Sequence, residues 1–107
     1  MKIGIVGVGK VGGAISFGFR RIGHTVLQHD IRLNTALADV LPADIIFICV
    51  PTPPDQNGAC DASRVLDVVA LLAQKHYRGL VAIKSTVTPG TTDVCRQLHP
   101  DLRLAFS

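Results

Sequence analysis

The sequence predicts an α/β fold, a doubly wound sheet of about five parallel strands with helices on both faces. Short runs rich in Ile and Val alternate along the chain with segments whose apolar residues recur at helical spacing. Strands that alternate with helices form parallel sheets with right-handed crossovers. The chain has 107 residues, of which 48% are hydrophobic and 18% charged, and we expect residues 1–107 to form one domain with its own core.

The N-terminal third predicts a strand, a helix and a second strand. Residues 2–6 are a short apolar run followed by glycine, as expected for a strand buried in a parallel sheet. Apolar residues recur at helical spacing over residues 10–22, and Gly23 stands where a left-handed helix cap is expected. The second strand is predicted over residues 25–29.

The connection that follows is short. Between Asp30 and Asp44 there are thirteen residues, room for one short helical segment with Asn34 as its candidate cap but not for a full helix and a further strand. We therefore expect the sheet to be shortened between its second and third strands. The apolar run of residues 44–50 predicts a central third strand, which Pro51 ends.

The remaining segments continue the alternation. Residues 51–58 are dense in turn-forming residues and predict a loop. A helix is predicted from about Ala62, capped by Asp61, and a fourth strand over residues 80–84. A short helix capped by Thr91 or Thr92 then runs to about Leu98, and residues 102–106 form the last strand.

A glycine pattern, Gly-x-Gly-x-x-Gly, lies between the first strand and the first helix. Gly7 permits the tight turn, Gly9 lets a pyrophosphate approach the backbone, and Gly12 lets the helix pack closely on the strand. Backbone N–H groups at Lys10, Val11 and Gly12, together with the helix dipole, would face the anion. The pattern predicts a dinucleotide-binding domain of the Rossmann type; the alternative is a turn that serves packing alone.

An acidic residue, Asp30, lies 23 residues after Gly7, at the end of the second predicted strand. A carboxylate there can accept hydrogen bonds from the adenosine ribose hydroxyls and would repel the extra 2′-phosphate of NADP, so NAD is favoured. Arg32 lies close enough to hold that phosphate, although a surface charge is the alternative interpretation. NADP therefore remains a minor possibility.

Two later motifs narrow the interpretation: Val50-Pro51-Thr52-Pro53, and Ser85-Thr-Val-Thr-Pro-Gly-Thr-Thr92. Together with the glycine turn they make the chain similar to the UDP-glucose/GDP-mannose dehydrogenase family. Members of that family oxidise the C6 alcohol of a nucleotide sugar to a carboxylate in two NAD-dependent steps. The resemblance implies NAD as the cofactor.

The resemblance also implies roles for individual residues. Gly7, Gly9, Lys10 and Val11 would line the pyrophosphate, and Asp30 the adenosine ribose. The loop that contains Pro51 and Thr52 would pass beneath the dinucleotide. Thr52 and Thr86 would contact the nicotinamide half, and Thr86 matches a threonine that helps place water near the reacting carbon. The alternative is that both threonines only cap turns.

The chain departs from the family in two respects. The family has a helix and a strand between the ribose acid and the strand before Val-Pro-Thr-Pro, so we expect a trimmed sheet edge and a shallower adenine pocket. The family also continues, beyond the position of Ser107, into the sugar-binding domain that holds its catalytic residues. We therefore expect no catalytic residue here apart from Thr86 as a water-positioning residue, and a domain that binds NAD without turnover on its own.

Two kinds of macromolecular partner follow from this expectation. One is a separate sugar-binding domain; the other is a second copy of the chain, associating through apolar residues near Leu102, Leu104 and Phe106. Nucleic acid is not expected, because the net charge of +3 is scattered and aromatic residues are few. No segment is long enough to span a membrane.

The three cysteines, Cys49, Cys60 and Cys95, are odd in number and form no Cys-x-x-Cys pair. This pattern argues against a disulfide framework or a metal site and favours the cytoplasm. Two other functions remain open. One is a stand-alone dinucleotide-binding or regulatory module without catalysis, and the other is a prephenate or 6-phosphogluconate dehydrogenase type, which lacks the two threonine loops.

Overall fold

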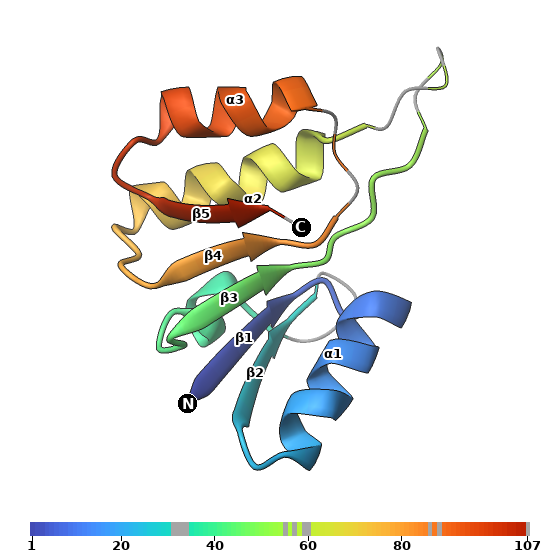
Figure 1. Cartoon of the computed structure of the whole chain (residues 1–107), viewed down its shortest axis with the longest axis vertical. Coiled ribbons are helices and arrows are strands. Elements are labelled where there is room, and N and C mark those ends of the chain that lie inside the picture. Colours follow the sequence, from blue (N-terminus) through green and yellow to red (C-terminus); the bar gives the residue numbers. More distant parts are fainter. Residues whose placement is uncertain are drawn as a thin grey trace.

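The computed structural model describes residues 1–30, 35–54, 56, 58, 61–85, 87 and 89–106, and its centre is a five-stranded sheet (Figure 1). All neighbouring strands are parallel, in the order β2-β1-β3-β4-β5. The predicted fold class is confirmed. In chain order the elements are β1 (Lys2–Val6), α1 (Lys10–Arg21), β2 (Thr25–His29), the 3-10 helix η1 (Leu37–Val40), β3 (Ile45–Ile48), α2 (Ser63–Gln74), β4 (Leu80–Ile83), α3 (Pro89–Leu98) and β5 (Arg103–Phe106).

The shortened connection between β2 and β3 is present as predicted. Among the described residues of this connection, the regular part is the single turn of η1, and β2 forms the edge of the sheet (Figure 1). The candidate cap Asn34 lies outside the described residues. Because η1 packs on the sheet beside β1, its buried Val40 and the neighbouring Ala43 take the place of a longer helix, against Gly4.

Two predicted helix starts differ in detail. The cap position of α2 is Ala62, but Asp61 Oδ1 accepts the N–H of Ser63 at 3.0 Å, and this bond lowers the pKa of Asp61. The acid therefore caps the helix from one residue further out. The prediction that Thr91 or Thr92 caps α3 is wrong, because the helix already begins at Pro89, whose fixed φ suits the first helical position.

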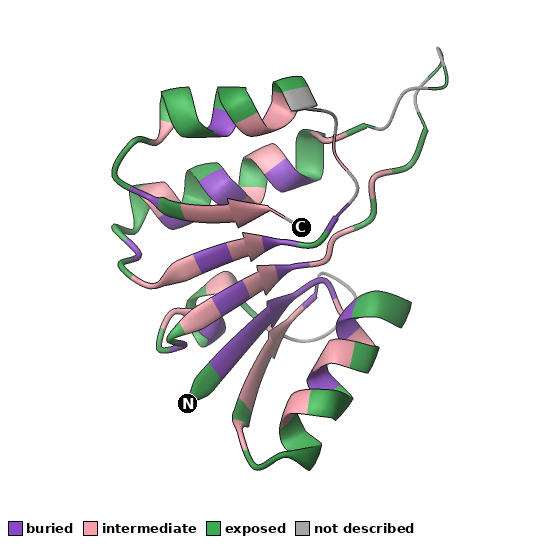
Figure 2. Ribbon diagram, viewed as in Figure 1, coloured by how far each residue is buried: buried purple, intermediate pink, exposed green. Residues whose placement is uncertain are grey.

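The core lies on the face of the sheet that α2 and α3 cover. Val65, Val69 and Leu72 of α2 are fully buried against Ile46 and Ile48 of β3. Buried residues concentrate in the central strands, whereas β2 at the edge has none (Figure 2). The opposite face of β1 is covered by α1, where Ile5 reaches the helix at Gly12.

The C-terminal strand leaves less apolar surface than predicted. Leu102 is buried, so the expectation of a patch there is wrong. Leu104 and Phe106 are half-buried against the core, and the Arg96 guanidinium lies 4.9 Å from the centre of the Phe106 ring. The large apolar side chains that are exposed lie elsewhere, at Met1, Val11, Phe17, Ile22, Leu71, Val94 and Leu98. None of the described helices is long and apolar enough to cross a membrane.

The glycine turn is the point where three backbone segments meet. Gly7 has a φ of +92°, and a Cβ on it would lie 2.7 Å from the backbone nitrogen of Val50. A Cβ on Gly12 would overlap the carbonyl oxygen of Gly7. Both glycines are therefore required by close packing, as the sequence pattern predicted.

Adjacent glycines of α1 allow a matched test of this packing. We expect Gly12→Ala to lower the free energy of unfolding by about 3 kcal/mol, because the new methyl group has no space. A Cβ on Gly13 meets nothing within 4 Å, so Gly13→Ala should raise stability by up to about 1 kcal/mol through helix propensity. Denaturant unfolding measures both; equal effects of the two substitutions would contradict the packing.

Tyr77 stabilises the end of the sheet opposite the glycine turn, where β3 and β4 begin. Its hydroxyl group donates a hydrogen bond of 2.7 Å to the carbonyl oxygen of Ala43, and the residue is buried. Burial, with a smaller contribution from the charge of Asp44, raises the pKa of Tyr77 from 10 to about 12. The protonated phenol is therefore part of the folded state.

This shift predicts a loss of stability at alkaline pH. Because the folded pKa of Tyr77 lies above the unfolded one, its contribution is present below pH 10 and is lost as pH rises from 10 to about 12. Tyr77 is the only tyrosine and there is no tryptophan, so phenolate absorbance reports this residue alone. Absorbance and circular dichroism should be titrated together, in water and in denaturant. A phenol half-ionised near pH 10 in the folded protein would contradict the structure.

Candidate functional site

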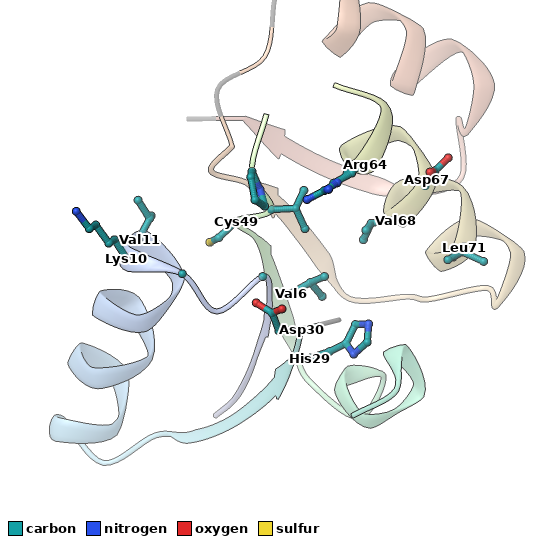
Figure 3. Close-up of a pocket in the computed structure, with 14 residues that line it drawn as sticks. Val6, Lys10, Val11, His29, Asp30, Cys49, Arg64, Asp67, Val68 and Leu71 are labelled. Atoms are coloured by element: carbon teal, nitrogen blue, oxygen red, sulfur yellow. The ribbon is translucent and has the colours of Figure 1, made fainter. Parts of the chain in front are cut away.

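A cavity of about 590 Å³ opens at the carboxyl ends of β1, β2 and β3 (Figure 3). Open α/β sheets bind their ligands at this end. The glycine turn and the start of α1 form one wall, the end of β2 forms the floor, and the end of β3 with α2 forms the other wall. The lining residues are Val6, Gly7, Gly9, Lys10, Val11, His29, Asp30, Cys49, Val50, Pro51, Arg64, Asp67, Val68 and Leu71.

Most of the predicted site residues meet at this cavity. Six of them line it: Gly7, Gly9, Lys10, Val11, Asp30 and Pro51. Gly12 is buried beneath the turn, against the Gly7 carbonyl, and Thr52 is half-buried beside the lining residues. Arg32 and Thr86 lie outside the described residues, so their predicted roles stay predictions.

The start of α1 suits a negatively charged group. Its cap residue is Gly9, and no side chain of the described residues caps the helix with a hydrogen bond. The first turn contains no acidic residue, and a Cβ on Gly9 would meet nothing within 4 Å. The first N–H groups of a helix have no partner within the helix, and the helix dipole is positive there. The exposed side chain of Lys10 adds a further positive charge.

A buried carboxylate stands beside this helix start. Asp30 is 7% exposed, and its Oδ2 accepts a hydrogen bond of 2.7 Å from the N–H of Val8. The N–H of Gly7 donates to the carbonyl oxygen of His29 at 2.8 Å. These two bonds join the glycine turn to the end of β2, so the acid and the turn hold a fixed position relative to each other.

Thr35 was not found by sequence reasoning. Its Oγ1 accepts the N–H of Asp30 at 3.1 Å, and it also lies 3.2 Å from the carbonyl oxygen of Asp30 and 3.0 Å from Nδ1 of His29. One hydroxyl group therefore fixes the backbone that carries the acid. A threonine six residues after the end of β2 is the only sequence signal, and it is too common to identify this role.

Ser85 was likewise recognised only as part of a motif. It is buried, and its hydroxyl group donates a hydrogen bond of 2.7 Å to the carbonyl oxygen of Val50. Its N–H also donates to the carbonyl oxygen of Ile48 at 3.2 Å. The serine of the Ser-Thr-Val motif thereby holds the end of β3, from which Pro51 enters the cavity wall.

The thiols of the described cysteines are not activated. Burial raises the pKa of Cys49 to about 11, although the charge of Lys84 acts in the opposite direction. Burial also raises the pKa of Cys95, which is fully enclosed. Both are protonated at neutral pH and unsuited to act as nucleophiles. Cys60 lies outside the described residues.

Comparison with known proteins decides the family. The sequence model of the NAD-binding domain of the UDP-glucose/GDP-mannose dehydrogenase family matches residues 32–103. The chain belongs to this family. NAD is accordingly the cofactor of the domain, and the resemblance found in the sequence motifs is confirmed.

Individual relatives of this dehydrogenase domain agree with the family. YtcA of Bacillus subtilis (strain 168) is 27% identical over 132 residues, which cover 92% of this chain and 31% of YtcA. UDP-D-ManNAc dehydrogenase from Pyrococcus horikoshii superposes with a TM-score of 0.81 at 23% identity, over 99% of this chain and 34% of the other. GDP-mannose dehydrogenase from Pseudomonas aeruginosa superposes with a TM-score of 0.77 at 23% identity, over 99% and 35%.

The lengths of these dehydrogenase relatives differ from that of the chain. The chain spans about a third of each relative named above. The alignment with YtcA is also longer than the 107 residues of the chain, so YtcA contains residues within the matched region that have no counterpart here. This difference agrees with the shortened connection between β2 and β3.

Proposed function

We propose that the chain binds NAD across the cavity and serves as the cofactor-binding part of a nucleotide-sugar 6-dehydrogenase. The observation that carries the proposal is the buried carboxylate of Asp30, hydrogen-bonded to the glycine turn beside an uncapped helix start. This combination offers one site for a diphosphate and one for a ribose, next to each other. Bound NAD would accept a hydride from the sugar substrate.

The pyrophosphate is assigned to the start of α1. The N–H groups of Lys10, Val11 and Gly12 supply donors there, and the open space at Gly9 lets the phosphates approach the backbone. The side chain of Lys10 would add a charge at the surface. The close packing of Gly12 on Gly7 holds these donors in place before the ligand arrives.

The adenosine ribose is assigned to Asp30. Its carboxylate is fixed by the N–H of Val8, and Thr35 fixes its backbone, so little side-chain freedom is lost when the ribose binds. An acid at this place accepts hydrogen bonds from both ribose hydroxyls and repels a 2′-phosphate. NAD should therefore bind more tightly than NADP.

The nicotinamide half is assigned to the loops after β3 and β4. Pro51 lines the cavity, and Ser85 holds the segment that leads to it. We propose that Thr52 and Thr86 contact this half of the cofactor and that Thr86 positions water, as in the family. A sugar-binding domain would then place the C6 alcohol against the nicotinamide.

We also propose that the protein works in the cytoplasm. The described thiols, Cys49 and Cys95, are free rather than joined in a disulfide, and Cys95 is buried. Thiols kept reduced are typical of that compartment.

Calorimetric titration with NAD and NADP tests the proposal. We expect the unsubstituted chain to bind NAD more tightly than NADP. Asp30→Asn keeps an acceptor for Val8 but loses the charge, and should weaken NAD binding about tenfold or more, since hydrogen bonds to a charged group contribute about 1.5–3 kcal/mol. The substitution should also reduce the difference in affinity between NAD and NADP.

Asp93→Asn is the matched control, because Asp93 is an exposed residue of α3 that does not line the cavity. It should bind both cofactors as the unsubstituted chain does. Failure of the unsubstituted chain to bind either dinucleotide would overturn the proposed function. Unchanged NAD affinity in Asp30→Asn would overturn the ribose assignment alone.

A further inference from the structure

The wall of the cavity that α2 supplies carries a cation that no sequence motif indicated. Arg64 lines the cavity together with Val68 and Leu71 of the same helix. These positions are four and seven residues apart, so they lie on one helix face. We propose that Arg64 binds the pyrophosphate of the dinucleotide from the wall opposite the glycine turn. This inference rests on the proposed function of the cavity and adds a residue to it.

The direction of the side chain supports this assignment. In Figure 3, Arg64 extends from the N-terminal end of α2 toward the end of β3, where Cys49 lies, while Val68 and Leu71 stand further along the helix. The guanidinium thus points toward the end of β3, across the cavity from the start of α1. The two apolar side chains lie on the side of the cavity that His29 lines.

The charge of Arg64 has no short-range partner within the described part of the chain. No described carboxylate forms an ion pair with it. Its charge reaches Asp61 only as a minor influence on that pKa, which the hydrogen bonds from Ser63 lower more. Asp67 lines the same cavity one turn further along the helix. A phosphate group bound at the glycine turn would therefore form a direct ion pair with the guanidinium, which no described carboxylate does.

The chemistry of guanidinium favours the phosphate over the adenine ring. Arginine presents five N–H donors in a planar fork that matches two oxygens of a phosphate group. Val68 and Leu71 provide the apolar surface that a purine requires, one and two turns further along α2. The phosphate-binding cation therefore lies near the start of α2, and the apolar surface for the purine lies further along the same helix.

The shortened sheet gives this second contact a physical role. β2 is the edge strand, so no neighbouring strand supports the adenosine side of the site. The diphosphate would then be held from both walls, by the N–H groups of α1 and by Arg64 of α2. Such a clamp restricts the ligand where the sheet itself is narrow.

The proposal is tested by titrating the protein with NAD, ADP and adenosine. NMR chemical shifts follow each titration, because they detect weak binding. We expect Arg64→Gln to weaken NAD and ADP about tenfold and to leave adenosine unchanged, because only the first two carry a diphosphate. Arg64→Lys keeps the charge and should lose less. The salt dependence of ADP affinity should become shallower in Arg64→Gln. Arg78→Gln, an exposed cation at the other end of the sheet, is the control.

Three outcomes would overturn the proposal in different ways. If Arg64→Gln leaves the affinity for NAD unchanged, Arg64 does not contact the cofactor, although the proposed binding of NAD is unaffected. Equal losses for ADP and adenosine would show that the guanidinium contacts the base instead. No binding of NAD to the unsubstituted chain would remove the proposed function together with this inference.

Discussion

The close packing at Gly7 is the constraint on which the rest of the site depends. At this residue the end of β1, the first turn of α1 and the backbone after β3 approach so closely that no Cβ fits. The positive φ of Gly7 turns the chain from strand to helix within that space. Because three elements are fixed at one point, the helix start, the β2 acid and the β3 loop face one another without help from a ligand.

Away from Gly7, the site is held by a few hydrogen bonds, each of which depends on one residue. The Val8 N–H holds Asp30, Thr35 holds the backbone of the same residue, and Ser85 holds the carbonyl oxygen of Val50. The bonds at Val8 and Ser85 join the end of one strand to a distant part of the chain, and the bond at Thr35 is local. These bonds hold the cavity lining although β2 is the edge strand and the connection from β2 to β3 is short, and preorganisation of this kind reduces the entropic cost of binding.

The sequence predicted those features that follow from local pattern. The strands, the helix after Gly9, the turn at Gly7 and the acid at Asp30 each have a spacing with a physical reason. The start of α3 at Pro89 was missed because the segment contains two signals for a helix start, a proline and a pair of threonines, and the sequence does not show which one applies. Thr35, Ser85 and Arg64 could not be predicted, because their roles depend on residues that only the folded chain brings near.

A map of the backbone amide shifts on addition of NAD tests the central claim most directly. The account predicts that the largest shifts arise at Gly9, Lys10 and Val11 and at the end of β2, while the opposite end of the sheet around Asp44 and Arg103 is unaffected. Shifts confined to that opposite end, or absent altogether at saturating NAD, would contradict the claim that the glycine turn holds the cofactor.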